Sequence, residues 1–116
     1  MNPFKLHVGP VVYDVQAVGR LQDGHGEDVA GLVTHSTEEV AIDAALPKRS
    51  QHVTVMHELI HTIFQQAGQR EWYSDEAMLD CIAYGLVGAK VESQFAPSPG
   101  VEVALLEPLF MIMADE

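Results

Sequence analysis

Apolar and polar residues alternate along the first third of the chain, the pattern of strands that bury one face. Between residues 11 and 21, Tyr13 and Val15 alternate with polar neighbours, which predicts a strand. A second strand is expected at 29–34, folding back on the first after a Gly- and Asp-rich turn. A third is expected at 40–44, where the apolar side is formed by Val40, Ile42 and Ala44. These residues predict a small antiparallel sheet of about three strands.

The spacing of apolar residues then changes from two to three or four, which is the spacing of an amphipathic helix. Six apolar residues share this helical spacing: Met56, Leu59, Ile60, Ile63, Phe64 and Ala67. Ser50 is a suitable N-cap and Gly68 a natural C-terminal stop, so a helix is expected over about 50–67. Its apolar side should be buried.

A second helix is expected to begin at Ser74-Asp75-Glu76 and to stop near Gly88. Its apolar stripe consists of Leu79, Ile82, Ala83 and Leu86. The strongly apolar stretch 101–113 predicts one or two short helices broken near Pro108. This segment is expected to close the core, because a small domain needs all its apolar helices. The alternative is a surface on which a second copy forms a homodimer. The whole chain, 1–116, is thus predicted to be one α+β domain.

Charge and cysteine content narrow the classes of partner and compartment. The net charge is −11 at pH 7, which argues against nucleic acid and anionic membranes, since both bind lysine and arginine. Cys81 is the only cysteine, so an intramolecular disulfide is excluded and a reducing compartment is favoured. We expect Cys81 to be a small buried hydrophobe. Without an apolar leader or a membrane-length apolar stretch, the expected location is cytoplasmic.

Residues 57–61 read His-Glu-Leu-Ile-His, an HExxH motif inside the first predicted helix. Histidines four residues apart lie on one helix face, so His57 and His61 can reach a single Zn²⁺. Glu58 then lies beside the metal, where it can act as general base on a water molecule. The motif therefore predicts a catalytic zinc ion, one per chain.

A catalytic zinc site needs a third protein ligand, and no histidine follows His61. The remaining donors are carboxylates, and Glu76 is favoured because a short turn brings the start of the second helix beside the first. Asp80, four residues later, faces the same way and can accept the outer N–H of a ligand histidine. Asp75 and Asp80 remain open as alternative third ligands.

HELIH on one helix, followed by Glu76 and Asp80 on the next, resembles the gluzincin branch of the zincin metallopeptidases. In size and layout the chain is most similar to short metallopeptidase-like proteins of phages and prophages, and to their repressor-cleaving relatives. The resemblance covers roughly residues 11–88. It implies a minimal zincin-like domain with zinc held by His57, His61 and Glu76, and Glu58 as general base.

The resemblance further implies a zinc-dependent peptidase that binds an extended peptide or protein substrate along the strand before the motif helix, here 40–44. Hydrolysis also needs a donor for the developing oxyanion. Four side chains are candidates: Tyr73, Tyr84, His35 and His52. The alternative function is a binding or regulatory module that keeps the fold with a structural or vestigial metal site. The glutamate of the motif favours catalysis, because a structural site does not need it.

Overall fold

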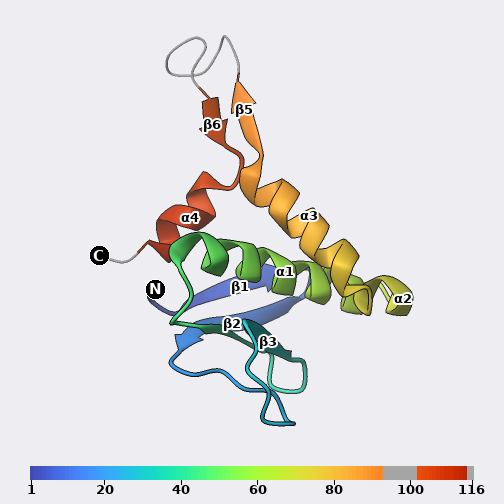
Figure 1. Cartoon of the computed structure of the whole chain (residues 1–116). Helices are drawn as coiled ribbons and strands as arrows, with labels where there is room; N and C mark the ends of the chain where they lie inside the picture. Colours follow the sequence, from blue (N-terminus) through green and yellow to red (C-terminus); the bar gives the residue numbers. More distant parts are fainter. Residues whose placement is uncertain (93–101, 115–116) are drawn as a thin grey trace.

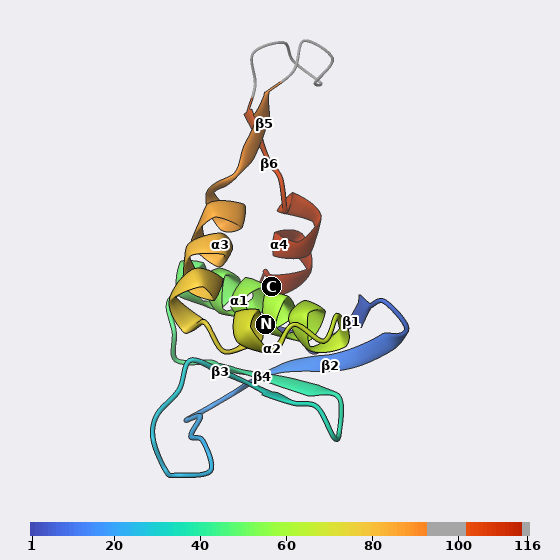
Figure 2. The same cartoon turned by 90° about the vertical axis from the view of Figure 1, so that its right-hand side faces the viewer.

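The computed structural model describes residues 1–92 and 102–114, which form three layers. A four-stranded sheet lies against one side of the long helix α1, and α3 and α4 lie on its other side (Figures 1 and 2). The elements in chain order are β1 (Phe4–Val8), β2 (Val11–Val18), β3 (Gly31–Thr34), β4 (Glu39–Asp43), α1 (Lys48–Gln66), α2 (Arg70–Tyr73), α3 (Glu76–Gly88), β5 (Lys90–Glu92), β6 (Glu102–Ala104) and α4 (Glu107–Met113). The predicted α+β class is confirmed.

The sheet is mixed, and not wholly antiparallel as expected. Its strand order is β1-β2-β4-β3, with β2 and β4 parallel and the other two pairs antiparallel. β3 therefore pairs with β4 and does not fold back on β2. Val40 and Ile42 of β4 are almost fully buried, whereas the residues of β3 are partly exposed. The strands β2 and β4 occupy the interior of the sheet, and β3 is left at the edge.

The helix α1 begins at Lys48, two residues before the predicted start. Pro47 occupies the N-cap position without a side-chain cap, and Ser50 lies inside the helix. Two sides of α1 are buried. Val55 packs into the cluster formed with the sheet, whereas Met56 and Ile60 pack against α3. The polar residues of the HExxH motif, His57, Glu58 and His61, belong to neither of these two clusters.

The turn after α1 brings α3 back alongside it. Gly68 has a φ of 70°, a left-handed conformation that glycine adopts without a Cβ penalty, and its N–H donates to the Gln65 carbonyl. The short helix α2 follows, which the sequence did not predict. Asp75 then caps α3 by accepting a hydrogen bond from the Met78 N–H at 3.0 Å. Leu79 and Ala83 pack against α1 with no exposed surface.

The C-terminal apolar stretch is only partly helical. Glu102–Ala104 forms β6, which pairs with β5, and Pro108 lies in the first turn of α4 without breaking a helix. Residue 101 lies outside the described residues. Met113 is buried in the cluster with the sheet, which agrees with the expected closure of the core. Met111 and Ile112, by contrast, are exposed.

Two further expectations concern single features. Cys81 is exposed on α3, so the expectation that it is buried was wrong. Among the described residues, every helix is too short or too polar to cross a bilayer.

Candidate metal centre

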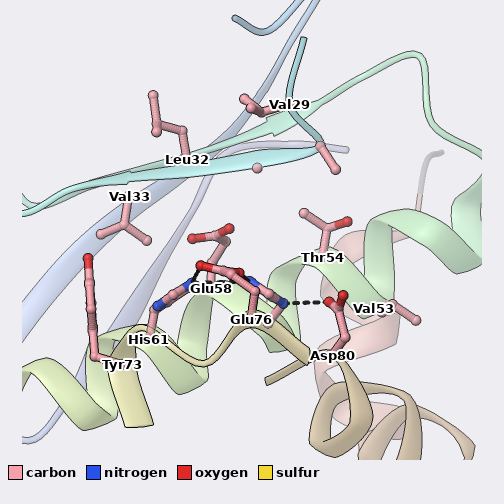
Figure 3. A pocket seen from close by; sticks show the side chains of 13 residues that line it. Val29, Leu32, Val33, Val53, Thr54, Glu58, His61, Tyr73, Glu76 and Asp80 are labelled. Carbon is pink, nitrogen blue, oxygen red and sulfur yellow. Dashed lines mark hydrogen bonds and ion pairs between the residues drawn. The ribbon is translucent and has the colours of Figure 1, made fainter. Parts of the chain in front are cut away.

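One face of α1, the edge strand β3, the end of α2 and the beginning of α3 surround a cleft of about 450 Å³. The three motif residues His57, Glu58 and His61 line it from α1, and Glu76 and Asp80 line it from α3. Figure 3 shows these acidic side chains and His61 below β3, with Tyr73 at one end of the cleft and Thr54 toward the other. The sequence-predicted site residues on these two helices are thus brought together.

The three predicted ligands present one donor atom each to a common point. The Nε2 atoms of His57 and His61 lie 3.1 Å apart. The Glu76 carboxylate lies against both of them, at 2.8 Å from His57 Nε2 and 3.1 Å from His61 Nε2. All three donor atoms lie within 4.8 Å of one another. This spacing is short enough for one ion to contact all three.

Asp80 holds the outer nitrogen of His57, and Asp75 does not enter the cleft. The His57 Nδ1–H donates to Asp80 Oδ1 at 2.7 Å, which leaves the Nε2 lone pair directed at the donor cluster. Asp75 is engaged as the cap of α3. Its side chain therefore does not compete with Glu76 for the ligand position.

The electronic character of this cluster fits a cation. With its proton on Nδ1, His57 aims a lone pair at both His61 Nε2 and an anionic carboxylate. Burial lowers the pKa of His61 and so favours a neutral imidazole with a free lone pair, although Glu76 opposes the shift. His61 Nδ1 is buried without a partner among the described residues. Two imidazoles and a carboxylate are a donor set that suits Zn²⁺.

Glu58 is buried beside this cluster. Burial raises its pKa to about 7, while His57 opposes the shift and the carboxylates of Glu76 and Asp80 add to it. A carboxylate with such a pKa can both accept and release a proton near neutral pH.

Space above Glu58 depends on the glycine at the start of β3. A Cβ built on Gly31 would lie 3.0 Å from Glu58 Oε1 and 2.6 Å from Thr54 Cγ2. Only a glycine lets the strand approach α1 this closely. Sequence reasoning missed Gly31, although an isolated glycine in a short strand is a known sign of close backbone approach.

The raised pKa of Glu58 predicts a pH dependence of stability in the metal-free protein. Because the folded-state pKa of about 7 exceeds the ordinary value of 4.5, the folded state binds the proton more tightly. The free energy of unfolding should therefore fall as pH rises from 4.5 to 7 and then level off, by up to about 3 kcal/mol from this group. Chemical denaturation in the presence of a chelator measures it. Glu58→Gln should remove this component, and an identical pH profile in the variant would contradict the assignment.

Of the four candidate oxyanion donors, only Tyr73 lines the cleft. Its ring packs edge-on against the His61 ring, with centroids 4.7 Å apart. Burial, together with the nearby Glu58 and Glu76, raises the pKa of Tyr73 and so favours the protonated phenol. His35 lies behind Tyr73 and contacts its hydroxyl.

The other two candidates lie outside the cleft. Tyr84 is 59% exposed on α3, and His52 stacks flat on Phe110 of α4, with ring centroids 4.2 Å apart. Neither side chain lines the cleft. Both expectations are therefore corrected: the helical positions of Tyr84 and His52 turn them away from the motif residues.

The strand that borders the cleft is β3, and not 40–44 as expected. β4 lies between β2 and β3, so both of its edges are paired and it cannot accept another strand. Directly before β3, the Ala30 carbonyl accepts a hydrogen bond from the Asp43 N–H at 2.8 Å, which makes these two residues a hydrogen-bonded pair. Such pairs alternate along an antiparallel ladder. The backbone groups of Gly31 and Val33 therefore face the open edge, which is unpaired among the described residues.

Comparison of the chain with protein-family models, with curated proteins and with solved structures gave no match.

Proposed function

We propose that this protein is a zinc-dependent peptidase, with zinc held by His57, His61 and Glu76. The observation that carries the proposal is the meeting of two imidazole nitrogens and a carboxylate in one cleft with a buried glutamate. A zinc ion that only stabilises a fold needs four protein ligands and no base beside them. Three donors and a buried Glu58 fit a site that acts on a water molecule.

Zinc, when bound, would supply Lewis-acid chemistry, polarising a water molecule and a peptide carbonyl. Glu58 would accept the proton of the attacking water and pass it to the leaving amine, a role that suits a pKa near neutrality. Asp80 would keep the Nδ1 proton on His57 and so fix the orientation of that ring. Glu76 would complete the ligand set from α3.

The open edge of β3 supports an extended peptide as the substrate. The unpaired N–H and C=O groups of Gly31 and Val33 can hydrogen-bond to the backbone of an added strand. Both residues also line the cleft, so a strand bound there would pass beside Glu58. Recognition through backbone groups would depend little on substrate sequence.

Metal analysis and a cleavage assay test this function together. The purified protein should contain about one zinc per chain and cleave members of a degenerate peptide library, as read by mass spectrometry. Chelation should abolish cleavage, and added Zn²⁺ should restore it. A metal-free protein that folds normally and gains nothing from Zn²⁺ would exclude the proposed function.

A further inference from the structure

Three side chains from separate parts of the fold form a chain of hydrogen bonds that ends at the cleft. Tyr13 on β2 contacts His35 Nδ1 through its hydroxyl at 3.4 Å. On the opposite side of the same ring, His35 Nε2 lies 3.0 Å from the Tyr73 hydroxyl. His35 directly follows β3, and its contact with Tyr73 links this edge strand of the cleft to α2.

The burial of Tyr13 determines the direction of these hydrogen bonds. Tyr13 is 3% exposed and belongs to the core cluster. Within the described residues, the partner that the structure gives its hydroxyl is His35 Nδ1. A buried O–H without an acceptor costs free energy, so the Tyr13 hydroxyl donates and Nδ1 accepts. With Nδ1 as the acceptor, the ring N–H of His35 is at Nε2.

The proton on Nε2 determines what Tyr73 can do. His35 Nε2–H donates to the Tyr73 oxygen, which uses a lone pair of that oxygen and leaves its own hydrogen unused. Tyr73 lines the cleft and stands at the end of it in Figure 3, with its hydroxyl directed toward β3. With the opposite tautomer the phenol would donate to His35 and would have no hydrogen left for a ligand.

We propose that Tyr73 donates its hydroxyl hydrogen to the substrate carbonyl oxygen as negative charge develops there, and that His35, fixed by Tyr13, is the positioning residue for this bond. The inference rests on the proposed peptidase function. It adds to that function a hydrogen-bond donor, Tyr73, and a positioning residue, His35, whose N–H at Nε2 points at the Tyr73 oxygen. Hydrogen bonds in a chain polarise one another, so donation by His35 also strengthens Tyr73 as a donor.

The position of the ring proton on His35 can be measured in the metal-free protein, without an activity assay. Two-bond ¹⁵N–¹H NMR correlations of the metal-free protein at pH 8 identify which nitrogen of His35 carries the proton. The expected result is Nε2–H in the parent and a loss of this preference in Tyr13→Phe. A parent His35 protonated on Nδ1 would overturn the inference.

Kinetics of a double-mutant cycle test the role of the chain. Tyr73→Phe should lower kcat by roughly 100-fold with little change in KM, the usual effect of removing one oxyanion donor. His35→Ala should lower kcat by at least about 10-fold in the parent, yet add nothing in the Tyr73→Phe background, because it acts through Tyr73. His35→Gln, which keeps an N–H donor, should recover part of the loss. His25→Ala, an exposed loop histidine outside the cleft, serves as the matched control.

The two proposals fail in different ways. If His35→Ala costs as much in the Tyr73→Phe background as in the parent, the positioning role is wrong while the peptidase stands. If the parent cleaves no peptide and Glu58→Gln changes nothing, the proposed function fails, and the role in catalysis fails with it.

Discussion

Glu58→Gln is expected to lower peptide hydrolysis by at least roughly 10³-fold while the protein keeps its zinc. Glutamine matches glutamate in size and fits the same buried space below Gly31, so the ligands should not move. It cannot take a proton from water, and loss of the general base leaves the metal alone to activate the nucleophile. The measurement is kcat/KM on a fluorogenic peptide, together with the zinc content of the same preparation.

Glu71→Gln is the matched control, because it makes the same chemical change on an exposed residue of α2 outside the cleft. It should leave kcat/KM unchanged. A Glu58→Gln protein that retains more than about a tenth of the parent activity would rule out Glu58 as the general base.

Glu76→Ala is expected to weaken zinc binding by more than about 100-fold. Residues that only orient a ligand already contribute 10- to 100-fold to metal affinity, and Glu76 contacts the point where both histidine nitrogens meet. Competition with a chromophoric chelator measures the affinity. Zinc binding equal to that of the parent would show that the third ligand lies elsewhere.

Two neighbours of Glu76 serve as graded comparisons. Asp80→Asn should weaken zinc binding by roughly 10- to 100-fold, because it loses the anionic acceptor of the His57 Nδ1–H. Asp75→Ala should leave zinc binding unchanged and lower the free energy of unfolding by about 1 kcal/mol, because Asp75 caps α3. The ranking of the three losses in zinc affinity would distinguish a ligand (Glu76), an orienting carboxylate (Asp80) and a helix cap (Asp75) within residues 75–80.

The helical part of the site was predictable because its geometry is local. A spacing of four residues places His57 and His61 on one face of α1. The connection between α1 and α3 is short, so α3 packs beside α1. Glu76 and Asp80 were therefore within reach of sequence reasoning. The start of α1 was harder to predict, because Pro47 is at the N-cap position and no side-chain cap marks it.

The sheet was harder to predict, because strand pairing is not a local property. Strands that are neighbours in sequence often pair, and the sequence therefore suggested that β3 pairs with β2. In the structure β4 lies between β2 and β3, and β3 is the edge strand. The strand β1 was also missed. The hydrogen bonds of Tyr13, His35 and Tyr73 join β2, the turn after β3 and α2, which are separated in sequence, and no residue pattern indicates them.

The close approach at Gly31 has a consequence for recognising other chains with this cleft. The backbone there lies against Thr54 and Glu58, so a methyl group at this position would meet these two side chains before it met any ligand in the cleft. A search pattern for such a cleft should therefore join a glycine in the preceding edge strand to the HExxH motif and to the ExxxD spacing of Glu76 and Asp80. Chains that have the helical motif but a larger residue in place of this glycine would have to hold their glutamate differently.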